Sequence, residues 1–133
     1  MKPRVSLIEI NKLKTHENVN SRKVNKLVKD ISLKKRVINP VVADKKTFVI
    51  LDGHHRLAAL KRIGVKRVPI YLVNYKSEAV RVYLRRKKLL SQILKDQVLS
   101  MGKLRENFPI KTTRHFIKNR ARNVNIKLER LLI

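Results

Sequence analysis

Five consecutive residues in the first half of the chain have the types and spacing to bind an anion together. They are Asp52, Gly53, His54, His55 and Arg56. An apolar run precedes them and a helical pattern follows, which is typical of a strand that leads into the start of a helix. The first turn of a helix has unpaired N–H groups and partial positive charge, so phosphate groups bind there. The simpler interpretation is a strand-to-helix turn with solvated polar residues.

Each residue type in this turn suits phosphoryl chemistry. Gly53 allows a ligand to approach the backbone closely, while His54, His55 and Arg56 add hydrogen-bond donors. Asp52 supplies a carboxylate that can hold Mg²⁺ or a hydroxyl proton beside the phosphate. The turn is therefore predicted to bind nucleotide phosphates, with Asp52 as the candidate metal ligand.

Two other segments contain candidate residues. Glu17 follows His16 in a polar connection, and it could act as a base if that connection folds over Asp52. Since exposed acids are the norm, a solvated loop carboxylate is the simpler interpretation. A late stretch gathers hydroxyls and cationic donors that suit a phosphate or a carboxylate, unless it is only a charged surface strand. It consists of Lys111, Thr112, Thr113, Arg114 and His115.

Composition excludes several other kinds of site. The chain has no cysteine, which removes disulfides, thiol catalysis and thiolate metal sites. Its four histidines have no helical pair at metal-ligand spacing, so structural zinc is not expected. The Gly-x-Ser-x-Gly elbow and the Walker phosphate loop are both absent, so a nucleotide must be held in another way.

The net charge of the chain is extreme. Its 133 residues include 34 Lys and Arg against 9 Asp and Glu, for a formal charge of +25. Both halves carry the excess, so we expect a polyanionic partner and non-specific nucleic-acid binding at low salt. Aromatic residues make up only 5%, few for a platform that stacks single strands. No apolar stretch approaches the roughly 20 residues of a membrane helix, and we expect a cytoplasmic protein.

The first half of the sequence reads as alternating strands and helices. Residues 5–10 and 68–73 have strand character, and β-branched runs at 38–43 and 47–51 flank a turn and predict a hairpin. Apolar residues recur at helical spacing from Val24 to Ile31, after a candidate cap at Asn20 or Ser21. A second helix is expected to open at Gly53 and to stop at Gly64.

The second half is expected to be mainly helical. The pattern predicts one helix over residues 77–90 and another over 93–101 that Gly102 closes. A polar and basic loop then enters a strand within 108–117, and residues 124–133 close the chain with a short helix. We expect residues 1–75 to form a nucleotide-binding core, with 76–133 packed onto it in one compact domain.

Three ordered motifs resemble those of the free L-serine kinases of the ParB/sulfiredoxin-like superfamily. Residues 51–57 are similar to the family's Asp-Gly-His-His-Arg nucleotide motif, and 108–115 are similar to its late Lys-Thr-Thr-x-His substrate motif. Residues 15–17 fall where the family has its early catalytic glutamate. The resemblance implies an α+β fold, a compact mixed sheet flanked by helices. The sulfiredoxin branch itself needs a Cys where His54 stands.

The resemblance also implies an activity and a set of roles. It implies Mg²⁺-dependent transfer of a phosphoryl group from ADP or ATP to free L-serine, giving O-phospho-L-serine for cysteine synthesis. Glu17 and Asp52 would be catalytic, residues 53–56 would bind the nucleotide, and residues 111–115 would bind the substrate. The chain is shorter than the family's kinases between Val73 and about Lys95. The alternative is a ParB-like DNA- or RNA-binding protein without kinase activity, and a metal-dependent nuclease is a weaker third interpretation.

Overall fold

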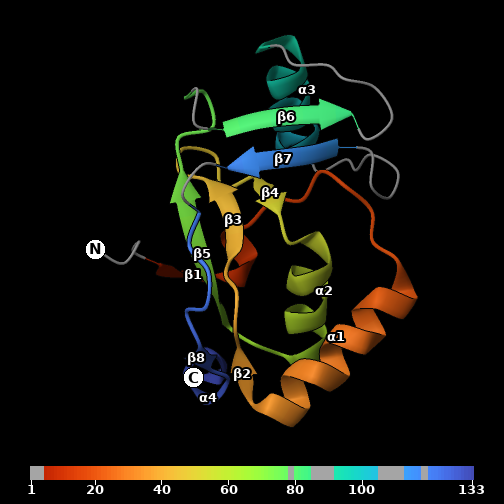
Figure 1. Cartoon of the computed structure of the whole chain (residues 1–133), viewed down its shortest axis with the longest axis vertical. Helices are drawn as coiled ribbons and strands as arrows, with labels where there is room; N and C mark the ends of the chain where they lie inside the picture. The colour runs from red at the N-terminus through yellow and green to blue at the C-terminus, as the bar shows by residue number, and fades with distance from the viewer. Residues whose placement is uncertain (1–4, 78–79, 85–91, 105–112, 118–119) are drawn as a thin grey trace.

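A mixed four-stranded sheet forms the centre of the computed structural model, which describes residues 5–77, 80–84, 92–104, 113–117 and 120–133. The sheet runs in the order β1-β5-β3-β4, with β3 parallel to β5 and the other neighbours antiparallel (Figure 1). Its strands are β1 (Ser6–Glu9), β5 (Arg67–Val73), β3 (Val41–Asp44) and β4 (Ile50–Asp52). The expected α+β class with a mixed sheet flanked by helices is confirmed.

The predicted hairpin is confirmed as the antiparallel pair β3 and β4. Asp44 fixes its turn, because one carboxylate oxygen accepts hydrogen bonds from the backbone N–H of Thr47 at 3.1 Å and from its hydroxyl at 2.7 Å. All four residues of β3 are buried, as expected for a strand with a neighbour on each side. The second strand of the hairpin, β4, ends at Asp52, two residues before the first residue of the next helix.

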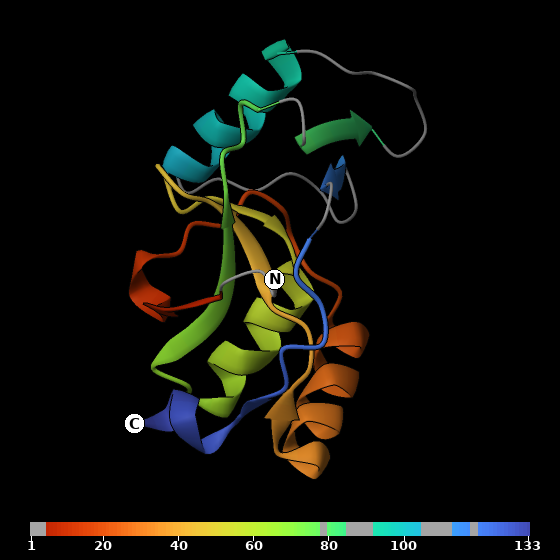
Figure 2. The ribbon, with the colours of Figure 1, turned by 60° about the vertical axis from the view of Figure 1, so that its left-hand side comes forward.

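Two helices pack against each other beside the sheet, and Figure 2 shows α2 lying between α1 and the strands. They are α1 (Ser21–Lys34) and α2 (His54–Ile63). The Asn20 side chain accepts hydrogen bonds from the N–H groups of Arg22 and Lys23, so the predicted cap is confirmed. Gly64 ends α2 in the left-handed conformation, as expected from the sequence.

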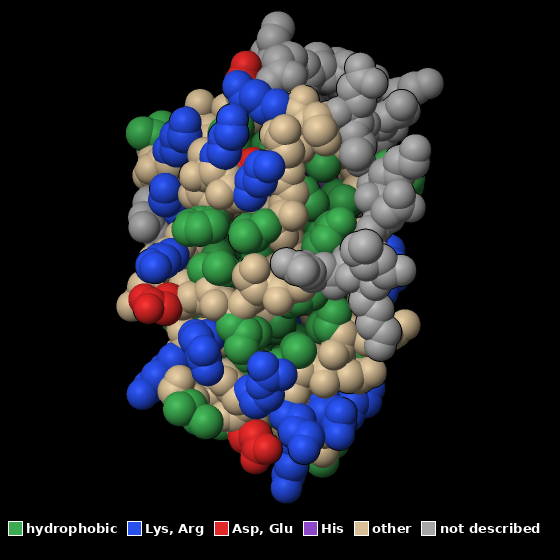
Figure 3. All heavy atoms as spheres, turned by 90° about the vertical axis from the view of Figure 1, so that its left-hand side faces the viewer, with side chains coloured by type: hydrophobic (Ala, Val, Ile, Leu, Met, Phe, Trp, Pro, Cys, Tyr) green, Lys and Arg blue, Asp and Glu red, His purple; other side chains and the backbone are tan. Residues whose placement is uncertain are grey.

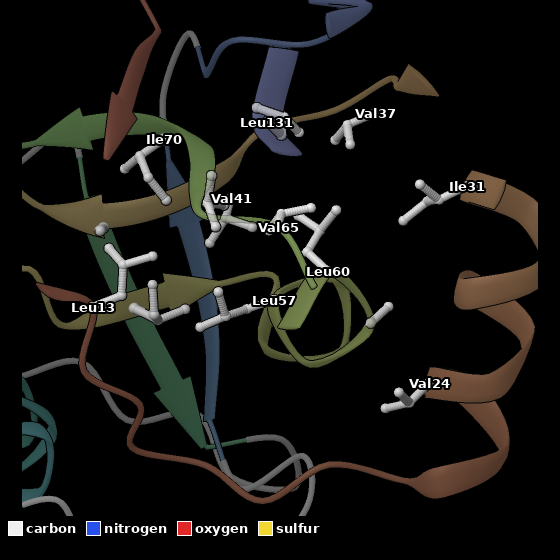
Figure 4. Packing of buried hydrophobic residues seen from close by; sticks show 14 residues of the cluster. Leu13, Val24, Ile31, Val37, Val41, Leu57, Leu60, Val65, Ile70 and Leu131 are labelled. Carbon is white, nitrogen blue, oxygen red and sulfur yellow. The ribbon is translucent and has the colours of Figure 1, made fainter. Parts of the chain in front are cut away.

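The main hydrophobic core lies between the two helices and the sheet. Figure 4 shows Leu57 and Leu60 of α2 near Val41 and Ile70 of the sheet, with Leu131 from the end of the chain above them. All five side chains are buried. The apolar residues of α2 recur at helical spacing, and those of the central strands form short apolar runs. Their burial in one core explains why the sequence pattern predicted these elements correctly.

The predicted helix over residues 77–90 is wrong. Residues 80–84 form strand β6 (Val80–Leu84), which pairs antiparallel with β7 (Thr113–Ile117), and residues 85–91 lie outside the described part. The apolar residues of this stretch also fit alternation at i, i+2 and i+4, which is the spacing of a strand. Pairing with a distant strand therefore decided between two patterns that the local sequence allowed.

The next helix is α3 (Gln92–Lys103), which confirms the helix expected over 93–101. Gly102 does not close it, because this residue lies inside the helix and is buried. A Cβ atom at Gly102 would come within 2.6 Å of a Val49 methyl group. The glycine therefore permits close packing of α3 on the residue before β4 and has no capping role.

Short elements complete the fold. They are the 3-10 turn η1 (Ile10–Lys12), the paired strands β2 (Arg36–Val37) and β8 (Ile126–Lys127), and helix α4 (Glu129–Leu132). The short helix expected near the end of the sequence is thus confirmed. Among the described residues, no helix is both long enough and apolar enough to span a bilayer.

Candidate functional site

The turn from β4 into α2 requires a glycine at position 53. Gly53 has a φ of 99°, a conformation that residues with a side chain rarely adopt. A Cβ atom there would also lie 3.2 Å from a methyl group of Val41 and 3.4 Å from its Cα atom. The sequence suggested that a ligand approaches the Gly53 backbone closely, whereas in the structure strand β3 lies against it. The start of α2 keeps the helix-dipole environment that suits an anion.

The two histidines of the turn hold the preceding segment of chain in place. Nε2 of His54 accepts a hydrogen bond from the backbone N–H of His16 at 3.2 Å. Nε2 of His55 accepts one from the backbone N–H of Asn20 at 2.9 Å. At these atoms both rings are acceptors, whereas the sequence suggested that they donate to a phosphate. Their first effect is to fix residues 16–20 over the start of α2.

Three histidines from distant parts of the chain meet beside β4. The His16 ring centre lies 4.6 Å from that of His54 and 5.7 Å from that of His115, in edge-to-face arrangements. The His16 ring hydrogen-bonds to the backbone of Ile50, and the His115 ring to that of Leu51. His115 also shares a 2.6 Å hydrogen bond with the Tyr75 hydroxyl. Strand β4 therefore ties the late motif to the early one.

Burial keeps this histidine cluster uncharged. It lowers the pKa of His16 from 6.5 to about 4. It also lowers the pKa values of His54 and His115 well below 6.5, with the neighbouring histidines as a further cause. At neutral pH these rings are therefore neutral hydrogen-bonding groups.

Glu17 is buried, with only 9% of its surface exposed, so its interpretation as a solvated loop acid is wrong. It lines a pocket of about 360 Å³ together with Thr15, His54, Leu57 and Lys61. Residues 14–17 are held inward because the backbone of Lys14 exchanges hydrogen bonds with those of Phe48 and Ile50. This pairing across the sheet edge has no local sequence signature, which is why solvation was the simpler expectation.

Asp52 forms an ion pair that the sequence did not predict. Its carboxylate lies 2.5 Å from Nη2 of Arg120, in a segment that follows β7. Arg56 donates to the backbone oxygen of Pro40 at 3.2 Å, and burial lowers its pKa, while Asp52 acts to raise it. Arg120 and Arg122 are close enough to Arg56 to lower its pKa further. Arg56 thus has one carboxylate and two other guanidinium groups as charged neighbours. The basic residues at 120 and 122 were the only hint of this arrangement in the sequence.

The late motif is only partly described. Lys111 and Thr112, and the side chains of Thr113 and Arg114, lie outside the described residues. The backbone of residues 113–117 forms β7, and His115 is placed in the histidine cluster. The structure thus brings three predicted segments together through His16, which contacts His54 and His115 and directly precedes Glu17.

The carboxylates present suit a magnesium ion only if a nucleotide supplies most of its ligands. In the part of the chain that the structure describes, no three His, Asp or Glu side chains gather as a metal site. Mg²⁺ commonly binds through one or two carboxylates together with phosphate oxygens and water. Asp52, which is about half exposed beside the start of α2, fits that requirement.

Comparison with known proteins identifies the chain's relatives. Residues 2–87 match the family described as ParB N-terminal domain. A ParB-like protein of Sulfolobus acidocaldarius is 39% identical over 70 residues, which cover 53% of this chain and 35% of that protein. An ADP-dependent L-serine kinase of Thermococcus kodakarensis is 31% identical over 80 residues, covering 57% and 33%. The chain thus aligns with only about a third of the length of these relatives.

Solved structures share the fold at low sequence identity. A conserved hypothetical protein from Pyrococcus furiosus superposes with a TM-score of 0.85 at 19% identity, covering 98% of each chain. A free serine kinase in complex with AMP superposes with a TM-score of 0.83 at 18% identity, covering 98% of this chain and 95% of the other. The fold expected from the three motifs is therefore confirmed.

Proposed function

This chain belongs to the ParB N-terminal domain family, and we propose that it is a nucleotide-dependent kinase that phosphorylates the hydroxyl of free L-serine. The observation that carries the proposal is the meeting of residues 16–17, the 52–56 turn and His115 around one buried cluster. These are the three segments that the serine-kinase resemblance named. The relatives described as ADP- and ATP-dependent L-serine kinases support the same reaction class.

The start of α2 is the proposed phosphate end of the site. Its helix dipole favours an anion, and Arg56 and Arg120 add positive charge beside it. Arg120 now binds Asp52 at 2.5 Å, and an arriving phosphate would compete for the same guanidinium group. We expect the terminal phosphoryl group of ADP or ATP to lie here, because developing charge on its oxygens is stabilised at this point.

Glu17 is the proposed general base. Its carboxylate reaches the pocket on the His54 side of α2, where the serine substrate would lie. Glu17 would accept the hydroxyl proton as the serine oxygen bonds to phosphorus and the bond to the departing nucleotide breaks. The neutral cluster around His16 holds this segment rigidly without adding positive charge that would weaken the base. O-Phospho-L-serine and AMP or ADP would be the products.

Asp52 and the late motif would complete the site. Asp52 would hold Mg²⁺ against the nucleotide, and the ion would neutralise charge on the phosphate oxygens when bound. His115 hydrogen-bonds to Tyr75 and to the backbone of Leu51, which fixes β7 beside β4. We propose that Lys111, Thr112, Thr113 and Arg114 contact the amino acid and its new phosphate group.

A direct assay tests the proposal. The purified protein is incubated with L-serine, Mg²⁺ and either ADP or ATP, and O-phosphoserine is measured by mass spectrometry. We expect product with at least one nucleotide. Glu17→Gln should lower kcat by about 10²-fold or more, as expected for loss of a general base. Glu9→Gln is the matched control, because Glu9 is an exposed acid on β1 and its loss should leave the rate within about twofold.

Two outcomes would overturn the assignment. One is the absence of product with either nucleotide from protein whose thermal unfolding shows that it is folded. The other is a Glu17→Gln variant that retains full activity. D-Serine and L-threonine as alternative acceptors would show whether the pocket selects the acceptor by shape.

A further inference from the structure

A cluster of exposed basic residues lies at the end of the molecule away from the candidate site, and we call it the basic end. It consists of Lys35, Arg36, Lys66, Arg67, Lys127 and Arg130. All are exposed except the half-buried Arg67. Figure 1 places α4, β8 and β2 at the lower end, while β4, β7 and the start of α2 lie in the upper part. The positive charge here is therefore separate from the arginines around Asp52.

Backbone pairing holds these residues together although they come from four parts of the chain. Arg36 and Lys127 are partners in the β2–β8 ladder. The N–H of Lys66 donates to the carbonyl of Leu131 at 2.8 Å, and Arg67 donates to the carbonyl of Arg130 at 3.0 Å. The cluster is thus part of the folded structure and does not belong to a flexible basic tail.

Few acidic side chains offset the charge of this surface. Glu129 is the one acid within the described β8–α4 segment, and Glu9 is the ladder partner of Arg67 in the β1–β5 pair. Asp30 on α1 is already paired with Lys34 at 3.2 Å. The basic surface continues along α1 through Arg22, Lys23, Lys26 and Lys29, all exposed. Arg22 and Lys29 are seven residues apart on α1, so this row extends for about 10 Å along the helix. Figure 3 shows Lys and Arg both at the lower end and at the upper left of this face, with hydrophobic side chains between them.

We propose that the basic end and the exposed row on α1 bind the sugar-phosphate backbone of duplex nucleic acid without reading its sequence. A duplex carries a negative charge about every 1.7 Å along its axis, so a long rigid array of cations releases many counterions on binding. No aromatic residue belongs to this surface, so it has nothing on which single-stranded bases would stack. The proposal does not depend on the kinase activity, because the two surfaces share no residue.

A membrane surface fits less well than a duplex. The apolar face of α1 is packed in the core through Val24 and Ile31. This face is therefore not available to insert into a lipid bilayer. Leu33 is exposed on α1, but single exposed hydrophobic residues are common on soluble proteins.

Fluorescence anisotropy with a labelled 30-base-pair DNA of arbitrary sequence tests the proposal across a salt series. The test variant replaces four exposed residues of the basic end with glutamine: Arg36, Lys66, Lys127 and Arg130. The matched control replaces four exposed lysines elsewhere with glutamine: Lys12, Lys45, Lys46 and Lys103. Both variants lose the same charge, so only the position of the charge differs. RNA duplex of the same sequence and vesicles with anionic lipid are parallel probes.

The proposal expects the unaltered protein to bind both duplexes with affinity that falls steeply with salt. The test variant should bind at least tenfold more weakly at 100 mM salt, with a log–log salt slope shallower by about 3. The control variant should change affinity less than threefold, and both should keep their serine-kinase rate. Equal weakening in the two variants would show a general charge effect and overturn the assignment. Absence of duplex binding at 50 mM salt, or binding to vesicles alone, would do so as well.

Discussion

The candidate site and the basic end use polar groups in opposite ways. The His16 and His54 rings are buried, uncharged and held by hydrogen bonds to backbone, so their energetics are set by desolvation. At the basic end the side chains are charged and exposed, so their energetics are set by solvent screening. We therefore expect the first region to respond to pH and the second to salt. The first and last predictions below test that contrast directly, and the others test the packing and the helix cap that support the two regions.

The largest effect should be acid destabilisation through the histidine cluster. His16 has a pKa of about 4 when folded and about 6.5 when unfolded, so the unfolded chain binds more protons between these values. The stabilisation is complete above pH 6.5 and is lost as the pH falls toward 4. From pH 7 to pH 5, His16 alone should remove about 2 kcal/mol from the free energy of unfolding. Burial acts in the same direction on His54 and His115.

Urea unfolding at pH 7, 6 and 5 measures this loss. The variant His16→Gln removes the titrating ring while keeping the backbone N–H that bonds to His54. Its free energy of unfolding should be lower at pH 7 and should fall less steeply with acid. An unaltered protein that is equally stable at pH 7 and pH 5 would contradict the neutral buried cluster.

A second effect concerns the packing that supports β4. Gly102→Ala places a methyl group within 2.7 Å of both methyl groups of Val49, which is fully buried. We expect this overpacking to lower the free energy of unfolding by about 2 kcal/mol. Because the clash is with Val49, the double variant with Val49→Ala should lose less than the sum of the two single changes. Thermal and urea unfolding of the four proteins measure this coupling, and strict additivity would contradict it.

The fold could be predicted wherever local patterns and tertiary packing agree. Asn20, Gly53 and Gly64 marked helix boundaries correctly because caps and left-handed turns depend on nearby atoms. Residues 80–84 were assigned wrongly because their pairing with β7 joins residues that lie 29 to 37 positions apart in the chain. Gly102 was misread for the same reason, since the atom it avoids belongs to Val49. Long-range contacts thus account for both errors.

The cap of α1 links the two regions, and its removal should have a moderate effect. Asn20→Ala removes the side-chain acceptor for two N–H groups and should cost about 1 kcal/mol of stability. Its backbone N–H to His55 remains, so kinase activity should change little. Asn20→Asp keeps an acceptor and adds negative charge at the helix start, so it should be at least as stable as the original. Chemical unfolding compares the three proteins, and equal loss in both variants would show that the cap is not the cause.

The smallest effect belongs to the exposed ion pair on α1. Asp30 and Lys34 are four residues apart, and both side chains are about half exposed. Asp30→Asn should therefore lower stability by only about 0.4 kcal/mol, and high salt should erase the difference. The same change removes an acid beside the basic end, so duplex binding should become tighter. A loss of more than 1 kcal/mol in the free energy of unfolding would contradict the view that solvent and salt screen the charges of this surface.

The site was predictable in its parts and only partly in its assembly. The motifs that contain Glu17, Asp52 and His115 could be identified from residue types and spacing, and the structure brings their segments together through His16. The burial of Glu17 and the pairing of Asp52 with Arg120 could not be predicted from the sequence. Both depend on segments that are distant in the chain and pack beside β4. Sequence patterns specify which groups are available, while packing decides which of them are buried.

Strand β4 is three residues long, yet it is where the beginning and the end of the chain meet. Its neighbouring backbone groups, at Ile50 and Leu51, bind rings that come from positions 16 and 115. During synthesis, the first hundred residues of the chain would emerge from the ribosome before His115 and Arg120 could reach their partners. The nascent chain would thus carry β4 and the His16–His54 contact without His115 and Arg120, and these later contacts would form only after β7 has docked.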